Sequence, residues 1–476
     1  MVMTTTLDIA SPHHDTIPTH PLHIKPLGNR LLARGPDARA GIGAWQPLPD
    51  ETLMLVLEFL DGPELAVLGS TCKFMHALCR SDELWKAIYL RLPKERSHSL
   101  PWRGSWRSTV RALPKDREAK VDCGCVFSDV LHRPFACSNI NLSQYVADIP
   151  EANLISRFDS LTYDDFAERW TERPFILTRC IRGWPACSLW TLDSLSRDYA
   201  DVEFRAEAVD WTLRQYWSYM NDNQDESPLY LFDRKFVEKM KIRVGREAEA
   251  AYWRPDCFGP DLLEVLGTER PAHRWLIAGP KRSGSTFHKD PNGTSAWNAV
   301  IQGAKYWIMF PPTACVPGVY VSADSSEVTS PLSIAEWLLT FHGEARRLPG
   351  CVEGVCLAGE ILHVPSGWWH LVVNLESGIA VTQNFVPLSP SLKLVSEVLS
   401  FLRDKPDQVS GFPTAVEDPY GLLVERLREA YPDVLDKALD LSLKRGGNKR
   451  KWDTAVKEAG QGFSFGFGVD DDVDVP

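Results

Sequence analysis

The sequence contains no long hydrophobic run. Across its 476 residues, no segment approaches the roughly 18 consecutive apolar residues that a membrane-spanning helix requires. The N-terminal stretch MVMTTTLDIASPHHD also lacks an apolar core of the length found in secretory signal peptides. We therefore expect a protein without a membrane anchor that remains inside the cell, in the nucleus or the cytoplasm.

The sequence also lacks an excess of positive charge and a regular spacing of cysteines. Its 52 lysines and arginines are outnumbered by 63 aspartates and glutamates, which gives a net charge of −11. This balance argues against nonspecific coating of nucleic acid, although local basic patches remain compatible with it. The eleven cysteines, an odd number, do not follow the rhythm of a disulfide scaffold and fit a reducing compartment.

The most informative stretch is GPKRSGSTFHKDPNGTSAWNAVIQGAKYWIMFPP, in which His288 and Asp290 lie two positions apart. In an extended strand this spacing directs both side chains to one face and sends Lys289 to the other. An imidazole and a carboxylate side by side are two of the three ligands in a 2-His-1-carboxylate site for Fe(II), which leaves coordination positions open. The same spacing recurs at His13 and Asp15, so the spacing does not identify a metal site by itself.

The surrounding sequence predicts strands on both sides of a turn. Residues 291–293 (Pro-Asn-Gly) predict a turn, 294–301 a strand, and 305–310 its antiparallel return in a hairpin. A third ligand is sought on another strand, and His370 lies in HVPSGWWHLVVNL, where a Pro-Ser-Gly turn precedes an aromatic and β-branched run. His363 precedes that turn, and we interpret it as a packed strand residue rather than a fourth ligand.

These segments together resemble one known family. RSGSTFHKDPNGTSAWNAVIQGAKYW, GWWHLVVNL and IAVTQNF are similar to the JmjC family of 2-oxoglutarate oxygenases, and to its branch named for arginine demethylation and lysyl hydroxylation. The resemblance implies an α+β protein whose residues 139–387 form a double-stranded β-helix, a cupin-type jelly roll with flanking helices. It also implies that His288, Asp290 and His370 bind Fe(II) and that no further side chain acts catalytically.

A binding site for 2-oxoglutarate is part of the same resemblance. The distal carboxylate of this cofactor needs a buried cation, and Lys305 takes that role by its family position, with a solvated strand lysine as the alternative. Ser285 departs from the family, since close relatives carry threonine there, and this puts the shape of the site in question more than its activity. The cofactor residues that the resemblance implies are Tyr230, Ser285, Asn298, Lys305, Thr382 and Asn384.

Residues 45–92 predict a small helical bundle. Apolar residues recur at helical spacing from Leu53 to Leu60, Gly62-Pro63 ends that helix, a second stripe runs from Leu65 to Cys79, and a third short helix begins at Leu84. The pattern resembles an F-box, which implies docking to a Skp-family adaptor of a cullin ubiquitin ligase. The contacts that we expect are Leu48, Pro49, Leu53 and Leu57.

The remaining segments carry weaker signals. Residues 1–44 lack periodicity and predict a disordered leader, and residues 93–138 predict a connector. Residues 388–445 predict three amphipathic helices, which in relatives of this branch can support a homodimer. Residues 446–476 predict a disordered tail, basic and then acidic, with a nuclear import signal as the alternative. Within the connector, Cys123, Cys125, His132 and Cys137 are better explained as packed residues and free thiols than as a zinc site.

The sequence therefore favours an Fe(II)- and 2-oxoglutarate-dependent protein oxygenase that hydroxylates lysine or demethylates arginine or histones. An F-box would link it to a cullin ubiquitin ligase. The alternative is an F-box adaptor for ubiquitination in which the JmjC domain only binds the target. The oxygenase is favoured because a binding module would not need all three metal ligands together with Lys305 and Asn298.

Overall fold

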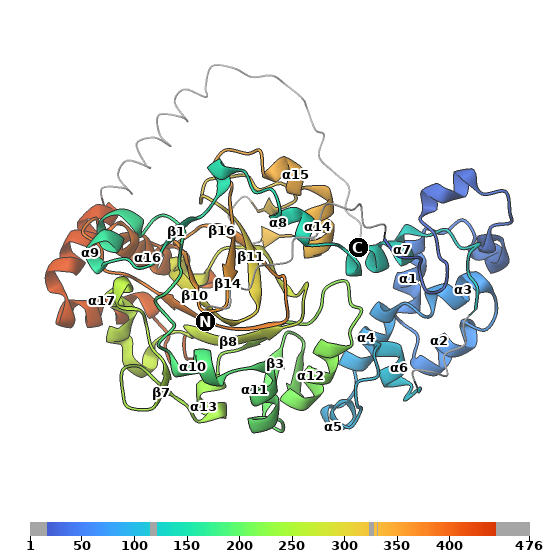
Figure 1. Cartoon of the computed structure of the whole chain (residues 1–476), viewed down its shortest axis with the longest axis horizontal. Helices are drawn as coiled ribbons and strands as arrows, with labels where there is room; N and C mark the ends of the chain where they lie inside the picture. The colour runs from blue at the N-terminus through green and yellow to red at the C-terminus, as the bar shows by residue number, and fades with distance from the viewer. Residues whose placement is uncertain (1–16, 115–120, 323–327, 331, 444–476) are drawn as a thin grey trace, which may run out of the picture. The chain divides into compact units, whose positions relative to one another are not determined.

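The structure is a computed structural model that describes residues 17–114, 121–322, 328–330 and 332–443 (Figure 1). Two compact units divide the chain. The larger contains Met1–Gly259, Ala272–Asp290 and Thr294–Phe385, and the smaller contains Pro260–Pro271, Pro291–Gly293 and the chain from Val386 onward. Among the described residues, every helix is too short or too polar to cross a membrane.

The larger unit is built around two β-sheets. The four-stranded sheet has the order β14 (Val352–Leu357), β11 (Ala304–Phe310), β16 (Trp369–Asn374) and β9 (Gly284–His288). The nine-stranded sheet has the order β1 (Ser156–Phe158), β2 (Phe175–Leu177), β15 (Ile361–Val364), β10 (Ser295–Gln302), β17 (Gly378–Phe385), β8 (Arg274–Gly279), β5 (Leu231–Asp233), β3 (Glu203–Ala206) and β4 (Val209–Thr212).

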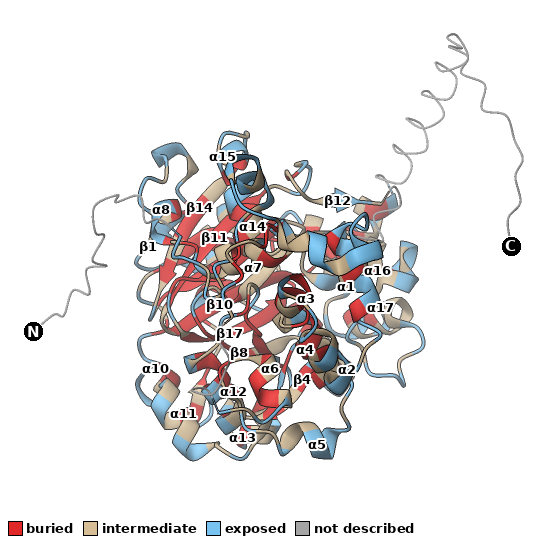
Figure 2. Cartoon of the chain, turned by 90° about the vertical axis from the view of Figure 1, so that its right-hand side faces the viewer, coloured by how far each residue is buried: buried red, intermediate tan, exposed pale blue. Residues whose placement is uncertain are grey.

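Side chains from the two sheets meet in one apolar cluster, which makes the sheets a sandwich. Val300 and Leu362 of the nine-stranded sheet lie in this cluster with Trp307, Met309 and Val372 of the four-stranded sheet. The alternate residues of the same strands point away, into two other cores that the surrounding helices complete. The strands are therefore buried on both faces, as the red ribbons in Figure 2 show.

The predicted hairpin of residues 294–310 is wrong. β10 pairs with β15 and β17 in one sheet, whereas β11 pairs with β14 and β16 in the other. The chain crosses between the sheets at Gly303, whose φ of +85° suits glycine, and a Cβ atom there would lie 2.8 Å from the Ser377 carbonyl oxygen. A tight turn between two apolar strands does not reveal whether the second strand returns to the same sheet.

The remaining elements cover and connect these sheets. Thr162 caps α9 (Tyr163–Asp165), because its side chain accepts a hydrogen bond from the backbone N–H of Asp165. The other helices are α8 (Ser143–Val146), η4 (Glu151–Asn153), α9 (Tyr163–Asp165), η5 (Phe166–Trp170), α10 (Pro185–Leu189), α11 (Leu192–Asp198), α12 (Leu213–Asn221), α13 (Phe236–Met240), η6 (Asp256–Phe258), α14 (Ile334–Thr340) and α15 (His342–Ala345), and the short strands are β6 (Arg243–Val244), β7 (Ala250–Tyr252), β12 (Tyr320–Val321) and β13 (Val328–Thr329).

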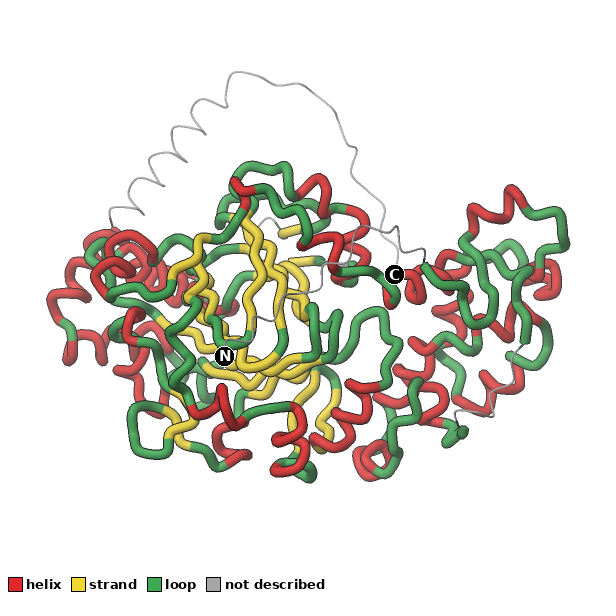
Figure 3. Tube along the Cα trace, viewed as in Figure 1, coloured by secondary structure: helices red, strands yellow, loops and turns green. Residues whose placement is uncertain are grey.

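The F-box region contains four helices, where three were predicted. They are α1 (Asp50–Leu57), α2 (Gly62–Leu68), α3 (Lys73–Leu78) and α4 (Asp82–Leu90), the short red segments joined by loops in Figure 3. The predicted second stripe divides between α2 and α3, because Cys72 adopts an extended conformation and caps α3. Gly62 begins α2 rather than only ending α1, and Asp61 forms a capping box there.

Two of the four expected adaptor contacts are wrong. Leu53 and Leu57 are 0% and 1% exposed, because one face of α1 packs into the core that contains Phe74 and Trp85. Leu48 and Pro49 are exposed as expected. The exposed large apolar residues of this region are instead Trp45, Leu48, Leu55, Val56, Phe59, Val67 and Leu90.

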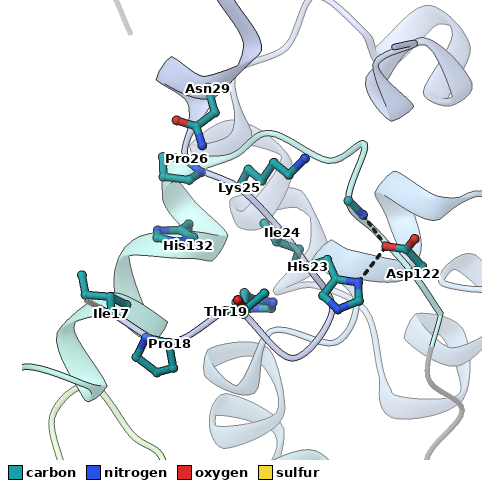
Figure 4. A pocket seen from close by; sticks show the side chains of 12 residues that line it. Ile17, Pro18, Thr19, His23, Ile24, Lys25, Pro26, Asn29, Asp122 and His132 are labelled. Carbon is teal, nitrogen blue, oxygen red and sulfur yellow. Dashed lines mark hydrogen bonds and ion pairs between the residues drawn. The ribbon is translucent and has the colours of Figure 1, made fainter. Parts of the chain in front are cut away.

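The leader is folded over residues 17–44, so the expectation of disorder is wrong for that part, while residues 1–16 lie outside the described residues. The segment forms η1 (Leu27–Leu32) and η2 (Ala38–Trp45) and contacts the connector. Lys25 forms a β-bridge with Phe127, and Asp122 accepts a hydrogen bond from His23 Nδ1 at 3.0 Å (Figure 4). These backbone and side-chain contacts order a segment that has no periodic pattern of its own.

The connector contains α5 (Lys94–His98), α6 (Trp106–Val110) and α7 (Asp129–Ser138). Cys123 and Cys137 are buried in two different cores, and neither belongs to a group of three metal-ligating side chains in the described chain. All eleven cysteines are described, and each is a free thiol, which agrees with our interpretation of the cysteines in the connector.

The F-box region and the β-sandwich share one hydrophobic core. Trp211 Nε1 donates a hydrogen bond to the Tyr89 hydroxyl at 2.8 Å. Trp106 Nε1 and the Tyr219 hydroxyl both donate to the buried Asp225 carboxylate, at 3.0 and 2.7 Å. The F-box is therefore attached to the oxygenase fold by buried polar and apolar contacts, not by a free linker.

The smaller unit is helical and has its own core. It contains η7 (Leu262–Glu269), η8 (Pro291–Gly293), α16 (Lys393–Asp404), η9 (Pro406–Gln408), α17 (Pro419–Ala430) and a further helix over 432–443. The three predicted C-terminal helices therefore form, whereas a homodimer through them remains a prediction. The predicted basic and acidic clusters of the tail lie outside the described residues.

Candidate metal centre and cofactor site

The three predicted metal ligands come together in the structure. His288 ends β9 and is the register partner of His370 in β16, and their ring centroids are 4.1 Å apart. Asp290 lies two residues beyond the end of β9. One ligand atom from each residue can be chosen so that all lie within 4.8 Å of one another, and no other group of this kind occurs in the described chain.

Hydrogen bonds to the backbone fix both histidines in the form that a metal needs. His288 Nδ1 lies 2.8 Å from the Thr286 carbonyl oxygen, and His370 Nδ1 lies 3.0 Å from that of Trp368. A carbonyl oxygen can only accept, so each Nδ1 carries a proton and Nε2 is the nitrogen of each ring that is left to bind a metal. Burial and the neighbouring His288 also hold the pKa of His370 well below its usual value, which keeps that imidazole neutral.

One carboxylate oxygen of Asp290 has no hydrogen-bond partner among the described residues. This atom, Oδ2, is buried. Burial raises the pKa of Asp290 to about 6, against the opposing effects of His288 and a hydrogen bond from Asn384. A buried carboxylate oxygen without a partner is unfavourable unless a cation occupies the site, so the donor set fits a divalent metal.

Lys289 points to the side opposite His288 and Asp290, as predicted. Its Nζ lies 4.5 Å from the Trp369 ring centroid and 3.0 Å from the Pro312 carbonyl oxygen.

Ser285, three residues before His288, would fall on the opposite face in a regular strand. A register shift between His370 and Val372 makes Ser285 the partner of Val372, which returns its side chain to the face of the metal ligands.

Lys305 is buried at the same inner face, and the alternative of a solvated strand lysine is wrong. It is 2% exposed, and its Nζ donates a hydrogen bond to the Tyr230 hydroxyl. Burial lowers the pKa of Lys305 from 10.5 to about 7, and none of the described carboxylates forms an ion pair with it. A buried amine without a counter-ion fits the distal carboxylate of a dicarboxylic acid.

The other predicted cofactor residues line the facing sheet. Asn298 of β10 and Thr382 of β17 are register partners, and Asn384 follows on the same face of β17. The Asn298 Oδ1 atom is buried and lacks a hydrogen-bond donor among the described residues. Thr382 Oγ1 donates to the Trp297 carbonyl oxygen at 3.0 Å, and Asn384 Nδ2 lies 2.8 Å from Thr294 Oγ1.

The residues that support Tyr230 were not predicted from the sequence. Asn374 Nδ2 donates to Ser283 Oγ at 2.9 Å beside this tyrosine. A Cβ atom on Gly279 would lie 2.2 Å from Ser283 Oγ and 2.7 Å from the Tyr230 ring, so only glycine fits there. The signal was present in the sequence, because a glycine inside an apolar strand is typical of a close approach.

The interpretation of His363 as a packed strand residue is confirmed. It is fully buried on the outer face of β15, where it stacks on Phe175 with ring centroids 4.9 Å apart. The adjacent tryptophans pack into two different clusters. Trp369 is buried in the core behind the four-stranded sheet, and Trp368 packs against the cluster between the sheets.

Comparisons with known proteins agree with this geometry. Residues 45–91 match the F-box-like family and residues 168–389 match the cupin-like domain family. The arginine-specific demethylase JMJ22 of Arabidopsis thaliana is 37% identical over 466 residues, which cover 93% of this chain and 88% of that protein. The chain belongs to the JmjC family of 2-oxoglutarate oxygenases.

Two further relatives of this JmjC oxygenase carry informative names. The lysine-specific demethylase JMJ21 of Arabidopsis thaliana is 35% identical over 74% of this chain and 38% of its own length. The bifunctional arginine demethylase and lysyl-hydroxylase psr-1 of Caenorhabditis elegans is 34% identical over 64% of this chain and 76% of its own length. The JmjC oxygenase is therefore a 2-oxoglutarate-dependent dioxygenase that uses Fe(II).

Proposed function

We propose that this JmjC oxygenase hydroxylates lysine or demethylates methylated arginine in protein substrates. The convergence of His288, Asp290 and His370 on one inner face with the buried Lys305–Tyr230 pair carries this proposal. The names of the relatives refer to arginine demethylation and lysyl hydroxylation, and they support the choice of substrate class.

One set of residues would hold the metal, and a second set would hold 2-oxoglutarate. His288, Asp290 and His370 would hold Fe(II), while Lys305 and Tyr230 would bind the distal carboxylate of 2-oxoglutarate. With both bound, the cofactors would supply an oxidation by dioxygen in which 2-oxoglutarate loses carbon dioxide; one oxygen atom of dioxygen ends in the succinate and the other enters a substrate C–H bond. Asn298, Thr382, Asn384 and Ser285 would orient the cofactor, and the buried inner face excludes bulk water around it.

Release of succinate with a panel of peptides tests this proposal. Peptides that contain lysine, arginine or N-methylated arginine are compared with matched peptides that carry norleucine or citrulline. Mass spectrometry then follows the peptide, since hydroxylation adds one oxygen and demethylation removes a methyl group as formaldehyde. Stimulation of succinate release by a basic peptide that is itself oxidised supports the proposal, and no peptide oxidation across the panel would contradict it.

We also propose that the F-box binds a Skp-family adaptor and so links the oxygenase to a cullin ubiquitin ligase. The match to the F-box-like family supports this link. The exposed apolar residues of α1, of the turn that follows it and of α2 offer a contact, since Val56, Phe59 and Val67 are 40%, 89% and 70% exposed. Leu48 and Pro49 directly precede α1 and are also exposed, whereas Leu53 and Leu57 are buried in the core.

The alternative, an adaptor whose JmjC domain only binds its target, is not favoured. Target recognition alone would not require histidines held as neutral ligands or an uncompensated buried lysine. We infer a reducing compartment, the nucleus or the cytoplasm, for the same protein. The eleven free thiols support this inference.

A further inference from the structure

Two aromatic rings form a stacked pair beside the cofactor residues. Phe232 of β5 and Trp275 of β8 have ring centroids 5.3 Å apart and ring planes 28° apart. Phe232 is 40% exposed and Trp275 is half-buried. A large aromatic side chain that remains open to solvent beside an active site is a candidate for substrate contact.

Strand alternation places both rings on the inner face of the nine-stranded sheet. Leu231 and Asp233 point to the opposite side, where both are buried, so Phe232 shares its face with Tyr230. Trp275 likewise shares its face with Ile277. Tyr230 and Ile277 lie in one apolar cluster, and Trp275 packs against that cluster.

The aromatic pair is continuous with both halves of the site. Trp275 is the register partner of Thr382, and Asn384, two residues further along β17, hydrogen-bonds to the metal-ligand candidate Asp290. Phe232 lies two residues from Tyr230, whose hydroxyl contacts Lys305. A side chain that rests on the pair therefore lies on the face of the nine-stranded sheet that carries Thr382 and Asn384, opposite the metal ligands of the four-stranded sheet.

The charges on the adjacent strands favour a cation. Arg205 of β3 lies on the same face as Phe232, but its charge is paired with Asp210 of β4 at 3.2 Å. Glu207, at the turn between these strands, accepts a hydrogen bond from the Tyr230 backbone N–H at 3.1 Å. Lys86 and Asp225 are the further charged groups that act on Glu207. The five groups together sum to −1, so the border of the aromatic pair is acidic.

We propose that the Phe232–Trp275 pair is the subsite that receives the cationic side chain of the substrate, an arginine or lysine in a peptide. The negative faces of the rings attract a guanidinium or ammonium group, and a planar guanidinium can also stack on the open face of Phe232. The inference rests on the proposed function and adds the residues that select the substrate. A neutral apolar side chain is the competing occupant, and it would gain only the apolar contact.

Binding of fluorescently labelled peptides to the full chain tests the subsite. Anisotropy is measured without oxygen, in the presence of Fe(II) and 2-oxoglutarate, for peptides that carry arginine, lysine, norleucine or citrulline at one position. Three variants are compared: Phe232→Ala removes the open ring, Phe232→Tyr keeps it, and Tyr320→Ala removes another exposed ring, 66% exposed, on β12. Circular dichroism confirms folding, and a separate titration measures the affinity for 2-oxoglutarate.

The expected pattern separates the competing outcomes. The wild type should bind the basic peptides about 5- to 30-fold more tightly than the neutral ones, and Phe232→Ala should lose most of that preference, which is about 1–2 kcal/mol. Phe232→Tyr and Tyr320→Ala should keep it, and the 2-oxoglutarate affinity of all three variants should match the wild type. Equal binding of norleucine and lysine peptides by the wild type, or an unchanged preference in Phe232→Ala, would overturn the inference.

The peptide oxidation assay distinguishes this failure from failure of the proposed function. If the wild type oxidises no basic peptide, the proposed function is wrong and the inference falls with it. If the wild type oxidises a basic peptide while Phe232→Ala shows the same peptide KM, only the inference is wrong. A raised peptide KM in Phe232→Ala, with the 2-oxoglutarate affinity unchanged, supports both.

Discussion

Lys305 donates a hydrogen bond to the hydroxyl of Tyr230 across the sandwich. Lys305 belongs to β11 of the four-stranded sheet, and Tyr230 directly precedes β5 of the nine-stranded sheet. Both side chains are buried, at 2% and 4% exposure. The pair therefore joins the two sheets at the point where the resemblance to JmjC oxygenases implies the distal carboxylate of 2-oxoglutarate.

Removal of the Lys305 ammonium should weaken the binding of 2-oxoglutarate without loss of iron. An unpaired buried carboxylate costs about 3–5 kcal/mol, so Lys305→Ala should raise the 2-oxoglutarate requirement by roughly two to three orders of magnitude. Lys305→Met keeps most of the side-chain volume and should behave alike, whereas Lys305→Arg should recover only part of the affinity. Titration of 2-oxoglutarate, with iron content measured on the same samples, checks this, and an unchanged half-saturation in Lys305→Met would remove Lys305 from the site.

The affinity for 2-oxoglutarate should depend on pH through the same lysine. Burial lowers the pKa of Lys305 to about 7, so the amine is largely neutral at pH 8 before the cofactor binds. The bound dicarboxylate favours the ammonium form, so binding at pH 8 should take up about 0.9 protons, and the dissociation constant should rise about tenfold per pH unit above 7. Calorimetry in buffers of different ionisation enthalpy measures this uptake. Lys305→Met should show none, and uptake that persists in this variant would assign the proton to another group.

The exposed face of the F-box should carry adaptor binding. Phe59→Asp together with Val67→Asp places charges on side chains that are 89% and 70% exposed, so the fold should be kept and capture of a Skp-family adaptor should be lost. Leu154→Asp, at a leucine 51% exposed outside the F-box, is the matched control. Pull-down with purified adaptor gives the answer. Undiminished capture by the folded double variant would show that this face is not the contact.

Damage to the F-box core should also impair the oxygenase, because the two parts share one core. Leu57→Ala should cost about 2–5 kcal/mol of stability, whereas Val56→Ala, its exposed neighbour, should change little. Thermal unfolding followed by circular dichroism, with 2-oxoglutarate turnover after heating, compares them. Leu57→Ala should lower both midpoints together. A loss of helix signal that leaves the oxygenase midpoint unchanged would mean that the parts unfold independently.

The sequence predicted the metal ligands because their chemistry is local. The spacing of His288 and Asp290 was not sufficient by itself, but the resemblance of the surrounding segments to one family completed the set with His370, and the structure brings all three together. The position of Lys305 in an apolar run predicted its burial for a similar reason. The carbonyl oxygens that hold both imidazoles belong to the backbone, so the residue types in the sequence could not predict these hydrogen bonds.

The predictions that failed needed information on which surfaces face each other. β10 and β11 read as a hairpin, because alternation along a strand does not say which sheet it joins. Leu53 and Leu57 have the same apolar character as a docking stripe, and only the packing of α1 shows that they face inward. The leader has no pattern of its own and is ordered by the connector, a contact between segments about a hundred positions apart, as between His23 and Asp122.

Iron content and succinate release, measured on the same samples of wild type, His288→Ala and Asp290→Ala, test the central claim most directly. Removal of one of three ligands leaves too few to hold Fe(II), so both variants should lose iron and succinate release while their circular dichroism stays that of the wild type. The wild type should bind one iron per chain and release succinate from 2-oxoglutarate. Succinate release at the wild-type rate by either folded variant would contradict the account.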